Sequence, residues 1–102
     1  MTLEEEMKLW EERANDKVSK LIDFAYKETK DIIYSYIDGF GSEHNPIKSV
    51  LAMYVLDGNI KYSIRELKNI LYNYDICNFD NIEYSNNPKL AKKIVEFEKS
   101  LN

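Results

Sequence analysis

The chain has 102 residues, of which 44% are apolar and 31% are charged, and its formal net charge is -4. This length suits a single domain over 1–102, and the composition argues against wholesale disorder. The acidic balance gives no general attraction to nucleic acid or to an anionic membrane surface, and no apolar run reaches the roughly 18 residues needed to span a bilayer.

The number of cysteines and the first residues of the chain indicate the cellular compartment in which the protein is expected. Cys77 is the only cysteine, which excludes an intrachain disulfide and a metal site built from paired cysteines. The chain opens with Glu4, Glu5 and Glu6 instead of the basic and then apolar stretches of a secretory signal. These features favour a cytoplasmic protein without a membrane partner, in which Cys77 is a buried structural thiol.

An uninterrupted helical pattern runs from Thr2 to Phe40, and Thr2 with Glu5 fits a capping box at its start. Its apolar positions recur every eleven residues, about 3.67 per turn, so they stay on one face of a nearly straight helix. In chain order this stripe consists of Leu3, Met7, Trp10, Ala14, Val18, Leu21, Ala25, Thr29, Ile32, Tyr36 and Phe40.

The length of this pattern creates a conflict, because a helix of about 55 Å is longer than a domain of this size is wide. Two solutions are open. The helix breaks near Asn15 and Asp16, which are indifferent helix formers, or its first third projects from the domain. Projection would leave Leu3, Met7 and Trp10 exposed, whereas folding back would place them on the core.

A second helix is predicted from the cap Asn45 and the first-turn Pro46 to about Asp57, before Gly58. Its middle, residues 50–56, is apolar nearly all round, which is typical of the buried centre of a domain.

Ser63 and Glu66 form a second capping box, which predicts a third helix from Ile64 to about Tyr74. A fourth, amphipathic helix follows the Asn-Pro pair at 87–88. We therefore predict an all-α fold of four helices, with the long first helix packed against three shorter ones.

The segment between the last two helices is rich in Tyr, Asn and acidic residues, and connections of this length are often functional. Apolar residues alternate with polar ones at Tyr72, Tyr74 and Ile76, and again at Ile82 and Tyr84. This alternation predicts, as an alternative to a plain loop, a short β-hairpin near 74–84.

Catalysis has little support in these residues. His44 is the only histidine and lies in a polar turn, where a solvated residue is expected, and its spacing from Cys77 gives no support for a Cys-His pair. The sequence contains neither a His-Glu-x-x-His motif nor a glycine-rich phosphate loop. We therefore expect that the protein is not an enzyme, that it has no catalytic residues, and that it binds neither a metal nor a cofactor.

Residues 47–56, the turn 57–59 and residues 62–71 together resemble the opening of a winged helix-turn-helix domain, in which an apolar helix is followed by a turn and a Ser-capped helix bearing Glu-Leu. The resemblance implies a DNA-binding regulator. Dimerisation through the first helix would strengthen this interpretation, because the reading of two half-sites usually needs a two-fold dimer. The acidic stretch that follows, with no Lys or Arg between Lys68 and Lys89, would repel phosphate. In this alternative interpretation the phosphate contacts are Lys89, Lys92 and Lys93.

The leading hypothesis is a protein-binding module: an inhibitor, adaptor or assembly subunit of the kind frequent among phage and mobile-element products. Exposed Trp and Tyr are the usual anchors of such interfaces. An acidic first helix favours a basic partner, such as a nucleic-acid-binding protein, and a homodimer is a further option. The predicted contact residues are Met7, Trp10, Glu11, Tyr74, Phe79 and Tyr84.

Overall fold

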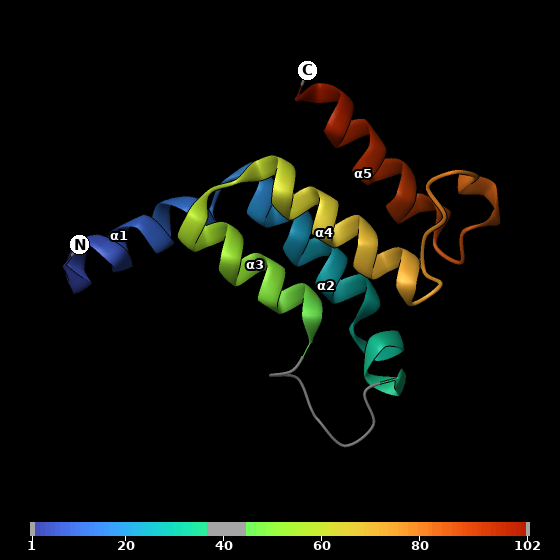
Figure 1. Cartoon of the computed structure of the whole chain (residues 1–102), viewed down its shortest axis with the longest axis horizontal. Coiled ribbons are helices and arrows are strands. Elements are labelled where there is room, and N and C mark those ends of the chain that lie inside the picture. The colour runs from blue at the N-terminus through green and yellow to red at the C-terminus, as the bar shows by residue number, and fades with distance from the viewer. Residues whose placement is uncertain (1, 37–44, 102) are drawn as a thin grey trace.

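The computed structural model describes residues 2–36 and 45–101. Within these ranges the chain forms α1 (Leu3–Ala14), α2 (Lys17–Tyr36), α3 (Pro46–Asp57), α4 (Ile60–Asn73), a short 3-10 helix η2 (Ile82–Tyr84) and α5 (Pro88–Ser100), and it contains no strand (Figure 1). The all-α prediction is confirmed. The alternative of a β-hairpin near 74–84 is wrong, because that segment consists of turns and η2.

The predicted long first helix is divided into α1 and α2. The Asp16 carboxylate accepts a hydrogen bond from the Ser19 N–H at 2.8 Å and so caps the start of α2. The Asn15 amide donates back to the Glu11 carbonyl at 2.8 Å. Short polar side chains at this position offer the backbone alternatives to helical bonding. The break near Asn15 and Asp16 is therefore confirmed, and the expectation of one continuous helix is wrong.

The eleven-residue stripe holds only in its middle. Its members from Val18 to Thr29 are buried, whereas Ile32 and Tyr36 are exposed and Ile33 is buried in their place. At about 100° per residue, Ile32 and Tyr36 still lie on the same side of α2 as Val18 and Leu21, so the helical period does not explain their exposure. Near its C-terminal end, α2 is covered on the side that carries Ile33 instead.

Asparagine side chains cap the next three α-helices. Asn45 caps α3, as predicted. Asn87 caps α5, which follows the Asn-Pro pair as predicted. The start of α4 differs from the prediction, because Asn59 accepts from the Tyr62 N–H at 3.1 Å and begins the helix at Ile60. Ser63 is thereby a buried residue inside α4 and not its cap.

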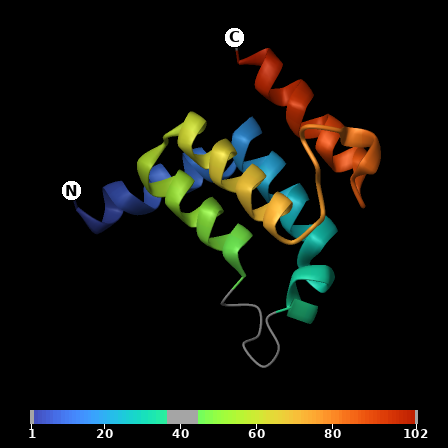
Figure 2. The same ribbon diagram turned by 45° about the vertical axis from the view of Figure 1, so that its right-hand side comes forward.

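Figures 1 and 2 show α3 and α4 side by side in front of α2. α5 runs along one edge, where Lys93 contacts α2 and Glu98 pairs with Lys68 of α4. The molecule is flat, with principal extents of 46 × 40 × 17 Å. The largest fully buried apolar side chains of the core are Ile22, Ile33, Ile47, Val55, Ile64, Leu67, Leu71, Ile76, Leu90 and Ile94.

The second predicted helix is less buried than its composition suggests. Val50, Tyr54 and Val55 of α3 are buried, but Met53 and Leu56 are exposed. A flat arrangement of helices covers α3 on only part of its circumference, so one side of an almost wholly apolar helix faces solvent.

Candidate partner-binding surfaces

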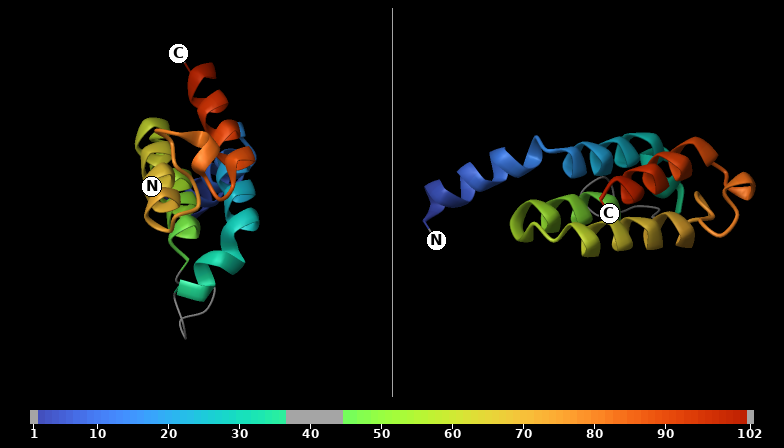
Figure 3. Two further views of the ribbon diagram at one scale, coloured as in Figure 1. Left: turned by 90° about the vertical axis from the view of Figure 1, so that its right-hand side faces the viewer. Right: turned by 90° about the horizontal axis from the view of Figure 1, so that it is seen from above.

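α1 carries the most exposed group of large apolar side chains along one helical face. None of its 12 residues, all within the described part of the chain, is buried. The exposed fractions are 72% for Leu3, 58% for Met7 and 42% for Trp10. Their spacing of i, i+4 and i+7 puts them on one face. The first turns of α1 extend past the turn between α3 and α4 at one end of the molecule (Figures 1 and 3).

The position of α1 depends on a polar contact with the end of α3. The Arg13 guanidinium donates to the carbonyls of Val55 at 3.1 Å and Leu56 at 2.8 Å. A cation at a helix C-terminus also interacts favourably with the helix dipole. Gly58 follows with a φ of 69°, and a Cβ there would lie 2.8 Å from Arg13 Cζ. Glycine is therefore required both by the left-handed backbone and by the approach of Arg13.

A second polar contact joins α3 to the break between α1 and α2. The Tyr54 hydroxyl donates to the Asp16 carboxylate at 2.5 Å. Burial, and then the hydrogen bond to Asp16, raise the pKa of Tyr54 to about 12. These contacts lie at the break and at the end of α3, so they leave the Leu3, Met7 and Trp10 face uncovered.

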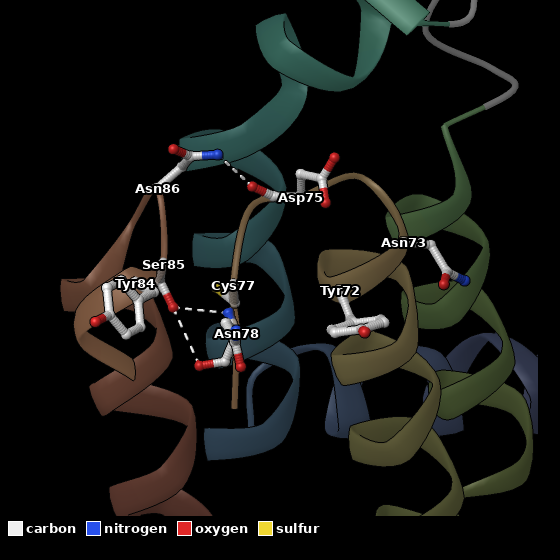
Figure 4. Close-up of a pocket in the computed structure, with 8 residues that line it drawn as sticks. All are labelled: Tyr72, Asn73, Asp75, Cys77, Asn78, Tyr84, Ser85 and Asn86. Carbon is white, nitrogen blue, oxygen red and sulfur yellow. Dashed lines mark hydrogen bonds between the residues drawn. The ribbon is translucent and has the colours of Figure 1, made fainter. Parts of the chain in front are cut away.

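The opposite end of the molecule has an open polar cavity of about 500 Å³ between α4 and the segment that follows it. Tyr72 and Tyr84 lie on opposite sides of this cavity (Figure 4). Tyr84 is 80% exposed. The complete lining consists of Tyr72, Asn73, Asp75, Cys77, Asn78, Tyr84, Ser85 and Asn86.

The polar groups of this cavity largely bond to one another. The Ser85 hydroxyl accepts from the Asn78 N–H at 2.7 Å and donates to the Asn78 carbonyl at 3.2 Å, while the Asn86 amide donates to the Asp75 carbonyl. Asp75 has a φ of 58° and closes α4 where glycine is usual, with the Ile76 N–H bonded to the Leu71 carbonyl at 2.9 Å. The segment is thus a fixed loop.

The structure does not bring the six predicted contact residues together. Met7, Trp10 and Glu11 lie on α1, whereas the other three lie at the opposite end (Figure 1). Tyr74 is half-buried with its ring 5.4 Å from that of Tyr36, and Phe79 is half-buried under the Lys68 ammonium at 5.1 Å. Of the loop aromatics, only Tyr84 is freely exposed.

Lys89, Lys92 and Lys93 are exposed on α5, as the alternative interpretation requires. The sequence did not reveal that two lysines of α2 lie beside one of them, Lys93. A groove of about 400 Å³ between α2 and α5 is lined by Lys17, Lys20, Leu21, Lys93, Glu96 and Phe97. The Lys93 ammonium also lies 3.8 Å from the centre of the Phe24 ring. No signal short of the fold itself pairs these two helices.

Cys77 is buried, which confirms the prediction of a structural thiol. Its sulfur lies 3.7 Å from the Asn87 carbonyl, and burial raises the pKa of the thiol to about 11. A thiol of this kind is almost wholly protonated at neutral pH and is a poor nucleophile. The other residue considered for catalysis, His44, lies outside the described residues.

Among the described residues, no group of three or more His, Cys, Asp or Glu side chains is placed to hold a metal ion. None of the helices described here has both the length and the apolar character needed to cross a membrane. No family model, curated protein or solved structure matches this chain.

Proposed function

We propose that this protein is a non-catalytic protein-binding module that docks on a basic partner protein through the exposed face of α1. The observation that carries the proposal is the exposure of Leu3, Met7 and Trp10 on a helix that buries none of its own residues. A core-facing helix normally buries its apolar stripe. An aligned apolar face without a covering element is typical of a helix that binds in the groove of a partner.

The side chains of this face suit an interface. Tryptophan is the residue most enriched among those that dominate binding energy, and methionine adapts its shape to a partner surface. Because Arg13 fixes the end of α1 on α3, the face is presented on an ordered helix, which lowers the entropy cost of binding.

The charge of α1 indicates the chemistry of the partner. Five glutamates accompany only two basic residues on this helix. They favour a partner groove with an apolar floor and basic edges, as many nucleic-acid-binding proteins present. An inhibitor or adaptor acting in the cytoplasm, such as mobile genetic elements encode, fits this chemistry.

The test is affinity capture of the tagged protein from its native cell lysate, with and without nuclease, read by mass spectrometry. We expect a protein partner that survives nuclease and is lost with the Met7→Ala/Trp10→Ala variant. Ile32→Ala is a matched control, because Ile32 is 43% exposed but lies on α2. Retention of the partner by the α1 variant would overturn the assignment of α1, and Tyr84→Ala would then test the opposite end.

A second candidate, a DNA-binding regulator, is favoured by the lysines that α2 and α5 bring together. The arrangement after α4 weighs against it, because α5 follows the fixed loop instead of a tight turn, and that loop carries Asp75, Asp80 and Glu83. Nuclease-sensitive recovery, with DNA binding lost in a Lys89→Ala/Lys92→Ala/Lys93→Ala variant, would put this candidate first.

A further inference from the structure

The groove between α2 and α5 has the chemistry proposed above for a partner of α1. Buried Leu21 and half-buried Phe97 supply its apolar surface. Its polar lining has three lysines, Lys17, Lys20 and Lys93, against the single acid Glu96. The groove is thus apolar at its base and basic at its edges.

α1 matches this groove in both properties. At about 100° per residue, Leu3, Met7 and Trp10 share one face, Glu6 borders that face on one side, and Glu4 and Glu11 border it on the other. An apolar stripe between acidic edges is complementary to an apolar base between basic edges.

The α1 of the same molecule is not placed to occupy this groove. Arg13 holds its C-terminal end on the carbonyls of α3, and Asp16 is bonded to Tyr54 of α3. From there α1 runs past the turn between α3 and α4 (Figure 3). Its apolar face is therefore available to another molecule.

We propose that α1 of one molecule docks in the α2–α5 groove of a second copy, and that the reciprocal contact closes a two-fold dimer. A dimer of this kind contains two copies of one helix-in-groove contact, with no open end that would lead to filaments. The inference rests on the proposed function in one respect, that α1 is a docking surface; a foreign partner would then compete with the second copy for the same face.

The test uses the full chain in sedimentation equilibrium at several protein concentrations and two ionic strengths, with two charge-reversal variants. One variant reverses the groove (Lys17→Glu/Lys20→Glu/Lys93→Glu), and the other reverses the edges of the α1 face (Glu4→Lys/Glu6→Lys/Glu11→Lys). We expect a wild-type dimer that weakens with salt, and dissociation constants raised roughly tenfold or more for each variant alone. Circular dichroism establishes that both variants are folded.

Mixing the two variants gives the decisive result. The basic α1 of one then faces the acidic groove of the other, while acidic α1 faces basic groove in the second contact, so a heterodimer should form with close to wild-type affinity. A monomeric wild type, a dimer insensitive to both reversals, or a mixture without heterodimer would each overturn the inference. Capture of a partner through Trp10 by a monomeric chain would overturn only this inference, whereas a dimer without a captured partner would overturn only the proposed function.

Discussion

At the scale of single residues, Asp16 determines how the first two helices join. One carboxylate oxygen caps α2 through the Ser19 N–H, and the other accepts from the Tyr54 hydroxyl of α3. The break itself was predictable from Asn15 and Asp16, because both form helices poorly. The contact with Tyr54 was not, because a residue so distant in the chain is brought to Asp16 only by the fold.

The raised pKa of Tyr54 predicts a pH dependence of stability. The folded state keeps the hydroxyl proton to about pH 12, whereas the unfolded chain loses it near the ordinary value of 10.0. This contribution to stability is complete below about pH 10 and is lost as the pH rises through about 12. Tyr54→Phe should lower the free energy of unfolding by about 1–3 kcal/mol at pH 7. The difference from wild type should shrink as the pH rises from about 10 to about 12.

Urea unfolding at a series of pH values measures this deficit. Tyr72→Phe is the matched control, because it removes the same hydroxyl from a tyrosine that is exposed. A constant gap between the unfolding free energies of wild type and Tyr54→Phe up to pH 12 would contradict the raised pKa of Tyr54.

The environment of Cys77 predicts a thiol that reacts only after the protein opens. With a pKa of about 11, roughly a thousandth of the buried thiol is ionised at pH 8, against roughly a tenth at the ordinary value of 9.0. Labelling with a disulfide reagent at pH 8 should therefore be at least tenfold slower in the folded protein than in urea-unfolded chain. Equal rates in both states would show that Cys77 is accessible.

At the scale of elements, the sequence predicted which segments are helical better than it predicted where each helix begins or ends and which helices pack together. The cap Asn45 and the Asn-Pro pair at 87–88 act on the next few residues, so local sequence was sufficient to place the starts of α3 and α5. The cap predicted at Ser63 was wrong, because Ser63 is buried inside α4 and Asn59 caps the helix, and the burial of Ser63 follows only from the fold. The alternation of apolar and polar residues at 72–76 wrongly predicted a β-strand. Tyr72 is still part of α4, and Asp75 then adopts the left-handed conformation that usually requires glycine.

The exposure of α1 predicts that its apolar residues contribute little to stability. Leu3→Ala/Met7→Ala removes no buried contact and should change the free energy of unfolding by less than about 0.5 kcal/mol. Ile22→Ala in α2 removes a fully buried side chain and should cost about 2–5 kcal/mol. Urea unfolding compares the two. A loss above 1.5 kcal/mol (roughly three times the expected limit) in the α1 variant would mean that this face is covered in the free protein.

At the scale of the whole molecule, the fold separates residues that the sequence grouped and joins residues that it did not. Trp10 and Tyr84 lie at opposite ends, because the helices fold back on one another and the loop after α4 ends far from α1 (Figure 1). Lys17 and Lys20, by contrast, meet Lys93 in one groove. Helical periodicity describes one face of one element and contains no information on which faces meet, so the basic groove followed only from the fold.

The distribution of charge predicts how binding to the proposed basic partner depends on salt. Glu4, Glu5, Glu11 and Glu12 are exposed on α1, so they should accelerate association at low ionic strength, and the acceleration should fall as the Debye length shortens to about 8 Å at physiological salt. Replacing all four by Gln should slow association at low salt and flatten its salt dependence. Stopped-flow association with the captured partner measures both the rate and its salt dependence.

The matched control removes the same number of exposed acidic charges from other parts of the molecule: Asp31→Asn/Asp57→Asn/Asp80→Asn/Glu83→Gln. If net charge alone steers the encounter, both variants will lose the same acceleration; if α1 is the docking surface, the control will keep most of the wild-type rate.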